Sequence, residues 1–190
     1  LGNPAKVNEA AKKLGVDLTG VEIIDHTTHP KFDEFANIYC ELRKKKGMTP
    51  GQASEVMKRD LFFAAMMLRE GLVDGSVAGS FASTADVMKA GIQIVGMPPG
   101  ISIVSSFFLM LFKEKTYSFA DCAVVPNPDA EQLADIAIST SDNHKKLTGE
   151  EPFIAMLSFS TKGSAIHKLA DKVIKATEII KTKRPDLNVD

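Results

Sequence analysis

The chain has 190 residues, of which 44% are hydrophobic and 25% are charged, with 23 Lys and Arg against 24 Asp and Glu. This composition is typical of a soluble globular protein and excludes a disordered or collagenous chain. The formal net charge of −1 leaves no global basic field for nucleic acid or acidic lipid, so any bound anion must be held by local cations.

The ends of the chain and its cysteines indicate the cellular compartment. Residues 1–4 lack the charged and apolar regions of a signal peptide, and no stretch reaches the ~18 apolar residues that a membrane span requires. Cys40 and Cys122 lack the spacing of a metal or redox motif, which favours free, buried thiols. We therefore expect a cytoplasmic protein without membrane or nucleic-acid contacts. Because residue 1 is not Met and residues 185–190 resemble the start of a strand, we expect a segment of a longer protein.

Helix caps and apolar spacing predict the first elements in chain order. Asn3 followed by Pro4 predicts the start of a helix that ends at Leu14. Residues 21–24, of which Val21, Ile23 and Ile24 are apolar, are typical of a strand. The apolar spacing over residues 31–46 predicts an amphipathic helix with a basic end.

A second group of elements follows before the middle of the chain. Residues 49–52 have the pattern of a capping box, so a helix is expected to start there and to include the nearly all-apolar run 61–68. Residues 73–79 predict a strand, and Ser83 is spaced to cap a helix over residues 85–93. These segments form a strand-loop-helix unit.

The breaker cluster at residues 98–100 predicts a domain boundary, with residues 1–100 in one α/β domain and residues 101–190 in another. Residues 101–112 and 117–125 are expected to form an antiparallel hairpin.

The last elements complete an alternating pattern. Asn127 and Pro128 predict the start of a helix that runs to about Ser141, residues 153–159 a strand, and residues 165–182 a helix. Strands that alternate with helices indicate an α/β fold with mainly parallel sheets.

Two loops are candidate phosphate sites, because each joins the end of a predicted strand to a helix N-terminus through small hydroxyl residues. For either loop by itself, simple helix capping remains an alternative. Neither has the Walker pattern, since Lys162 precedes the glycine. The candidate residues are Ser83 and Thr84 in the first loop and Ser160, Thr161, Gly163 and Ser164 in the second.

Other charged residues allow a plain and a functional interpretation. Residues 43–46 are basic and form either a solvated helix end or a fork for a phosphate ester, for which Arg43 is the best candidate. His26 and His29 lack a third ligand, so we expect structural histidines and no metal site. His144 and His167 are expected at the surface.

Three stretches together form a long and specific pattern: FADCAVVPNP at residues 119–128, AEQLADIA at 130–137 and MLSFSTKGSA at 156–165. They resemble the phosphate acetyl/butyryltransferase family, and the similarity continues through residues 41–47 and 73–75. The resemblance implies two α/β domains of isocitrate/isopropylmalate dehydrogenase-like architecture with a cleft between them. It also implies a homodimer and the reversible conversion of acetyl-CoA and phosphate to acetyl phosphate and CoA, with coenzyme A as substrate and no other cofactor or metal.

The resemblance also suggests roles for single residues. Arg43 matches an arginine linked to CoA binding, and Ser83 and Thr84 match hydroxyl residues of the cleft. Lys89 stands where the acetyltransferases usually carry arginine; it keeps the charge but loses the bidentate fork, which leaves propionyl or butyryl transfer as an alternative. The family's general base, with a neighbouring Ser and Arg, is expected beyond Asp190, so no catalytic residue is assigned.

Two further function classes compete with this interpretation. A non-catalytic acyl-CoA-sensing domain is known from related domains fused to malic enzymes. A dehydrogenase shares the expected two-domain architecture, but the chain has no G-x-G-x-x-G fingerprint to support it.

Overall fold

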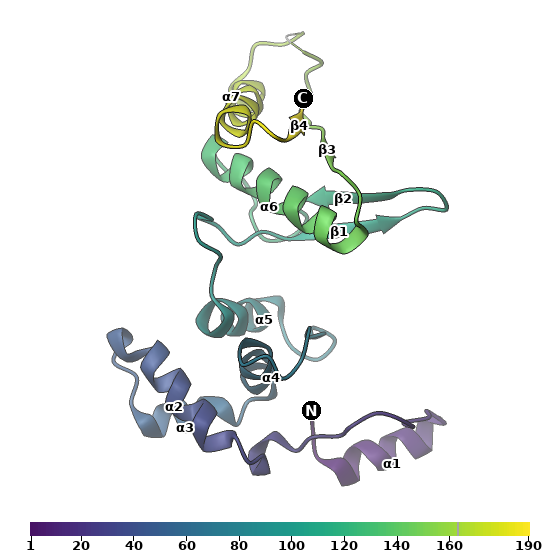
Figure 1. Cartoon of the computed structure of the whole chain (residues 1–190), viewed down its shortest axis with the longest axis vertical. Coiled ribbons are helices and arrows are strands. Elements are labelled where there is room, and N and C mark those ends of the chain that lie inside the picture. The colour runs from purple at the N-terminus through teal and green to yellow at the C-terminus, as the bar shows by residue number, and fades with distance from the viewer. Residues whose placement is uncertain (163) are drawn as a thin grey trace. The chain divides into compact units, whose positions relative to one another are not determined.

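The computed structural model describes residues 1–162 and 164–190. The chain divides into two compact units, unit 1 over Leu1–Gly96 and unit 2 over Met97–Asp190 (Figure 1). None of the described helices combines the length and the apolar character needed to cross a membrane.

Unit 1 is built from helices. They are α1 (Pro4–Leu14), η1 (His26–Thr28), α2 (Phe32–Leu42), η2 (Lys44–Lys46), α3 (Pro50–Met57), α4 (Asp60–Arg69), α5 (Thr84–Ala90) and the π-helical η3 (Gly91–Val95).

Local capping explains where several of these helices begin and end. Asn3 accepts a hydrogen bond from the Lys6 N–H at 3.2 Å, and Gly15 ends α1 in the left-handed conformation with φ of 66°. Thr49 and Gln52 form the expected capping box at the start of α3. The helix over 4–14 and the cap at Thr49 are therefore confirmed. The helix predicted over residues 31–46 breaks at Arg43, where a short 3₁₀ turn replaces its basic end.

The core of unit 1 is aromatic. Phe35, Tyr39, Phe62 and Phe63 are almost fully buried, and the Phe35 and Phe63 rings lie 5.0 Å apart. Smaller apolar side chains complete this cluster, which joins α2, α3, α4 and η3. These helices hold the ends of α2 and α5 in place, and both ends carry candidate site residues.

Unit 2 combines strands and helices. Its elements are β1 (Phe107–Leu111), β2 (Thr116–Ala120), α6 (Ala130–Thr148), β3 (Phe153–Ile154), α7 (Lys168–Lys183) and β4 (Asn188–Val189). β1 and β2 pair antiparallel, with Phe107 opposite Ala120, which confirms the predicted hairpin. β3 and β4 pair parallel, which confirms a strand near the end of the chain. The α/β class expected from the sequence is thus correct.

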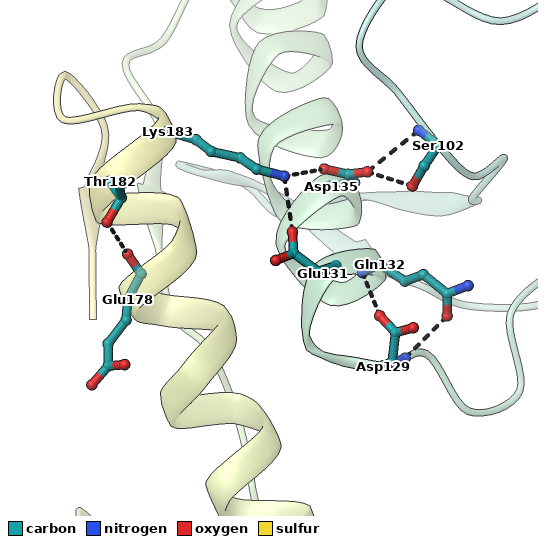
Figure 2. Close-up of polar contacts among 8 residues, drawn as sticks. All are labelled: Ser102, Asp129, Glu131, Gln132, Asp135, Glu178, Thr182 and Lys183. Atoms are coloured by element: carbon teal, nitrogen blue, oxygen red, sulfur yellow. Dashed lines mark hydrogen bonds and ion pairs between the residues drawn. The ribbon is translucent and has the colours of Figure 1, made fainter.

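The core of unit 2 uses smaller side chains and a buried carboxylate. Ala134, Ile138, Ala176 and Ile180 pack where α6 meets α7. Asp135 is only 6% exposed, and Figure 2 shows Lys183 of α7 and Ser102 converging on its carboxylate. Burial raises the pKa of Asp135, but hydrogen bonds from Ser102 and Lys183 outweigh burial and lower it.

Several predicted strands are wrong or too long. Residues 21–24 and 73–79 form no strand; the Ile24 carbonyl accepts one hydrogen bond from the Gly2 N–H at 3.0 Å, but no ladder follows. The strand predicted over residues 153–159 is reduced to β3. A strand requires a hydrogen-bonded neighbour. Among the described residues, segments 21–24 and 73–79 have no paired strand, and in segment 153–159 only Phe153 and Ile154 pair with β4. The expectation of mainly parallel sheets is not met by the described strands, which form one antiparallel and one parallel pair.

Two helix starts also differ from the sequence expectation. Asp129, not Asn127, caps α6, because its carboxylate accepts from the Gln132 N–H at 2.9 Å in a capping box. α6 then continues to Thr148, beyond the predicted end at Ser141. α7 begins after His167, whose Nδ1 accepts from the Leu169 N–H at 3.1 Å.

Candidate functional site

Arg43 ends α2 in a half-buried position of unit 1. Its backbone N–H donates to the Tyr39 carbonyl at 3.1 Å, which fixes the start of its side chain. The Nε atom of Arg43 is buried and has no hydrogen-bond partner among the described residues. Since a buried unsatisfied donor is costly, this guanidinium is suited to an anionic ligand.

The basic run that follows Arg43 is exposed. Lys44–Lys46 form η2, and Gly47 ends this turn with φ of 77°, a conformation that favours glycine. Lys44 pairs with Glu41 at 3.1 Å, and both side chains are largely exposed. The run therefore has the features of a solvated helix end, and Arg43 differs from it by its burial.

The first hydroxyl loop ends at the cap of α5. Ser83 Oγ accepts from the Asp86 N–H at 3.2 Å and donates to Asp86 Oδ2 at 2.8 Å. Thr84 is the first residue of α5, and Lys89 lies in its last turn; both side chains are exposed. Ser83 thus performs the capping role that was the alternative to phosphate binding, and it does so with its hydroxyl proton directed at a carboxylate.

Arg59 joins this group, although no sequence motif marks it. Its Nη2 donates to Asp86 Oδ1 at 2.9 Å, and its guanidinium carbon lies 4.7 Å from the centre of the Phe62 ring. The hydrogen bond from Ser83, followed by that from Arg59, lowers the pKa of Asp86. The pairing joins α5 to the turn before α4, a contact between residues far apart in the sequence, which local pattern analysis cannot detect.

Tyr39 is buried beside the ring of Phe62, over which Arg59 stacks. Its hydroxyl donates to Gln93 Oε1 at 2.6 Å, and the ring is 2% exposed. Burial raises the pKa of Tyr39, whereas the nearby charges of Arg43 and Arg59 act to lower it. The positive charge of Lys89 likewise acts on Asp86. Unit 1 therefore carries Arg43, Arg59 and Lys89 on separate helical elements; we call these three side chains the cation group.

The second hydroxyl loop lies in unit 2 and satisfies its own backbone. Ser160 Oγ accepts from the Ala165 N–H at 3.0 Å and lies 3.2 Å from Ser164 Oγ. The Thr161 carbonyl accepts from the Ser164 N–H at 2.8 Å. Gly163 lies outside the described residues. The loop does not lead directly into a helix N-terminus as expected, because His167 takes the cap of α7.

The histidines have structural contacts. His26 and His29 lie against the Phe63 ring, at centroid distances of 5.7 and 5.3 Å. His144, expected at the surface, is buried, with Nδ1 3.0 Å from Ser118 Oγ. The longer α6 places it on the packed side of that helix. No group of three or more potential metal ligands occurs in residues 1–162 and 164–190. Cys40 and Cys122 are free and half-buried.

Two cavities lie in the described part of the chain, in different units. A cavity of about 530 Å³ in unit 1 is bounded by α4 and residues 73–82 and so ends beside Ser83. A cavity of about 610 Å³ in unit 2 is bounded by β2, α6 and residues 150–156. None of the site residues predicted from the sequence lines the larger cavity, and the lining of the smaller one ends at Ala82, one residue before the cap of α5.

Comparison with known proteins gives a consistent result. The chain matches the phosphate acetyl/butaryl transferase family over residues 1–190. It is 47% identical to a phosphate acetyltransferase of Thermoanaerobacterium thermosaccharolyticum, with 100% of this chain and 59% of that protein covered. It is 41% identical to a phosphate acetyltransferase of Escherichia coli, with 100% of this chain and 26% of that protein covered.

Solved structures agree with the sequence relatives. The EutD phosphotransacetylase from Staphylococcus aureus superposes with a TM-score of 0.88 at 35% identity, covering 100% of this chain and 58% of that one. A phosphotransacetylase from Streptococcus pyogenes gives a TM-score of 0.87 at 38% identity, covering 100% and 57%. The chain thus spans well under two thirds of the length of these relatives.

Proposed function

The chain belongs to the phosphate acetyl/butaryl transferase family, and on this basis we propose that the whole protein transfers an acetyl group reversibly between coenzyme A and inorganic phosphate. The observation that carries the proposal is the extent of the family match, which runs over residues 1–190 and so includes the whole cation group. Unit 1 supports it with cations that a phosphate-bearing substrate requires.

In the proposed reaction the thiolate of coenzyme A attacks the acetyl carbonyl of acetyl phosphate. The new C–S bond forms as the C–O bond to phosphate breaks, and phosphate leaves with the electron pair. Thiolate formation requires a general base, and the departing phosphate requires cations to stabilise its charge. Coenzyme A is a substrate here, and the proposed scheme uses no covalent enzyme intermediate, no metal and no further cofactor.

The residues named from the sequence take binding roles in this proposal. Arg43, half-buried and with an Nε that has no partner among the residues described, is proposed to hold a phosphate of coenzyme A. Ser83, Thr84 and Lys89 are proposed to line the same substrate surface. Hydroxyls of the second loop, at Ser160, Thr161 and Ser164, are proposed as a further binding surface.

Lys89 raises a second candidate for the acyl group. Its exposed ammonium is a point charge and cannot form the paired contacts of a guanidinium. Transfer of propionyl or butyryl groups is therefore the alternative to acetyl transfer. We also propose that the protein acts in the cytoplasm, where coenzyme A thioesters are made and used, and that it forms a homodimer.

An assay of the whole protein tests the proposal. Coenzyme A is supplied with acetyl, propionyl or butyryl phosphate, and thioester formation is followed over time. We expect acetyl-CoA to form with the highest kcat/KM. Preference for butyryl phosphate would establish the alternative, and tight binding of coenzyme A without turnover on any acyl phosphate would contradict the enzyme and favour an acyl-CoA-sensing domain.

A further inference from the structure

Arg59 is held in place by residues outside its own helix. It occupies the N-cap position of α4, where its side chain makes no capping hydrogen bond. Two contacts fix its guanidinium instead, the hydrogen bond to Asp86 Oδ1 at 2.9 Å and the stacking over Phe62 at 4.7 Å. A guanidinium held against an aromatic ring and a carboxylate has lost much of its conformational freedom before any ligand binds.

The two contacts leave most of the guanidinium available. An arginine side chain carries five N–H donors, and the Asp86 contact uses the Nη2 end. The side chain of Arg59 is 44% exposed, and Asp86 is its only ion-pair partner among the described residues. The planar fork matches the geometry of phosphate oxygens, which it can bind through paired hydrogen bonds.

Lys89 adds a second positive charge that acts on Asp86. The hydrogen bonds from Ser83 and Arg59 lower the pKa of Asp86, and the charges of Arg59 and Lys89 lower it further. An anionic phosphate group bound by the free end of the Arg59 guanidinium would therefore also be attracted by Lys89.

We propose that Arg59 is a further phosphate-binding residue of the cation group and that Asp86 is its positioning residue. The inference rests on the proposed function for the identity of the ligand, a phosphate group of coenzyme A or the phosphate that is transferred. Asp86 holds the Ser83 hydroxyl with its other oxygen, Oδ2, at 2.8 Å. One carboxylate thus orients a cation and a hydroxyl on the same surface.

A purely structural ion pair is the competing account. Exposed ion pairs contribute little to stability, so that account predicts small changes in melting temperature and no change in ligand affinity. Lys58 provides a matched control, because it precedes Arg59, carries the same charge and pairs with Glu55 at 2.6 Å with 53% exposure. Within residues 1–162 and 164–190 its ammonium makes no ion pair or hydrogen bond to α5.

The test measures binding by the whole protein. Calorimetric titrations with coenzyme A, 3′-dephospho-coenzyme A and inorganic phosphate compare the wild type with Arg59→Gln, Arg59→Lys, Asp86→Asn and Lys58→Gln. We expect Arg59→Gln to lower the affinity for at least one ligand by ~10-fold or more, the size expected for a lost charge-assisted hydrogen bond. Arg59→Lys should lose less affinity than Arg59→Gln. The affinity should fall about threefold in Asp86→Asn and by less than twofold in Lys58→Gln. Steady-state kinetics should show the loss from Arg59→Gln in KM and not in kcat.

The ligands separate the sources of phosphate. A loss for coenzyme A but not for its 3′-dephospho form assigns Arg59 to the 3′-phosphate, equal losses for both assign it to the pyrophosphate, and a loss for inorganic phosphate assigns it to the transferred group. Affinities for all three ligands within twofold of wild type in both Arg59 variants would overturn the inference. If wild type binds these ligands in an Arg59-dependent way but transfers no acyl group, the proposed function fails and the inference stands.

Discussion

The two units use their cations in different ways. In unit 2, Arg184 pairs with Asp142 at 3.1 Å and with Asp186 at 2.8 Å, and Lys183 pairs with Glu131 and Asp135. In unit 1, Arg43 is half-buried with an Nε that has no partner in the described part of the chain. Cations of unit 2 are thus engaged in holding helices together, whereas the cation group of unit 1 retains capacity for a ligand.

The cores of the two units also differ, because only that of unit 2 depends on a charged side chain. Unit 1 buries Phe35, Tyr39, Phe62 and Phe63, and apolar burial is insensitive to pH. Unit 2 buries small apolar side chains together with Asp135, whose hydrogen bonds require a charged carboxylate (Figure 2). Acid should therefore weaken the packing around Asp135 in unit 2 before it weakens the aromatic core of unit 1.

The largest effect is expected from the aromatic core of unit 1. Phe63→Ala should lower the free energy of unfolding by about 3–5 kcal/mol, because it removes a fully buried ring and leaves a cavity. Phe81 is fully exposed, so Phe81→Ala should change the free energy of unfolding by less than about 0.5 kcal/mol. Denaturant unfolding of both variants measures the difference. Equal effects would show that the aromatic cluster is not the core.

A smaller loss is expected from the carboxylate network of unit 2. Asp135→Ala leaves the Ser102 donors and the Lys183 ammonium without their acceptor, and should cost about 1.5–3 kcal/mol, the range for hydrogen bonds to a charged group. Glu41→Ala removes an exposed ion pair with Lys44 and serves as control, with a change within about 0.5 kcal/mol. A loss from Asp135→Ala no greater than that of the control would rule out a structural role for the network.

Acid sharpens the contrast between the units. The pKa of Asp135 and that of Asp121, which accepts from Ser106, Ala123 and Val124, lie below their usual value despite burial. Their stabilisation is present above the unfolded-state pKa of 3.8 and is lost as the pH falls through the lower folded pKa. Hydrogen exchange should therefore accelerate in α6 before α2 as the pH falls below about 4. In Asp135→Asn the pH dependence of α6 should flatten, and an unchanged profile would count against this origin.

The smallest effect is expected at the exposed end of α5. Lys89→Arg restores a bidentate donor and should lower KM for a phosphate-bearing substrate by about two- to fivefold, with little change in kcat. Lys89→Ala should reduce kcat/KM on acetyl, propionyl and butyryl phosphate alike. If the rescue by arginine depends on acyl length, Lys89 sets acyl specificity; changes within twofold throughout would identify it as a surface lysine.

The success of sequence interpretation depended on how local each feature is. The caps at Asn3 and Thr49 were predicted because the donor and acceptor lie within one helical turn. The predicted cap at Asn127 is wrong although Asp129 and Gln132 have the same capping-box spacing as Thr49 and Gln52, because the Asn127-Pro128 pattern also fits a helix start. The predicted strands at residues 21–24 and 73–79 are wrong, because an apolar run identifies a candidate for strand pairing but not its partner.

The candidate site likewise contains residues that local patterns predict and residues that only long-range contacts reveal. Arg43 and Ser83 were found from a basic run and a capping pattern, whereas Arg59 was missed because its significance lies in a contact with Asp86 from a distant element. His144 is wrongly predicted at the surface because it lies among charged residues in the sequence, although α6 continues past it and buries it. Burial and long-range ion pairs are properties of the folded chain, and a single sequence contains no local signal for them.

The central claim is that the cation group of unit 1 holds the phosphates of the substrate while cations of unit 2 hold the fold. The most direct measurement compares KM for coenzyme A and for acetyl phosphate in Arg43→Ala and Arg184→Ala of the whole protein. We predict that Arg43→Ala raises KM for coenzyme A by ~10-fold more than KM for acetyl phosphate. Arg184→Ala should lower stability and leave the ratio of the two KM values unchanged. Equal effects of Arg43→Ala on both KM values, or a shifted ratio in Arg184→Ala, would contradict the claim.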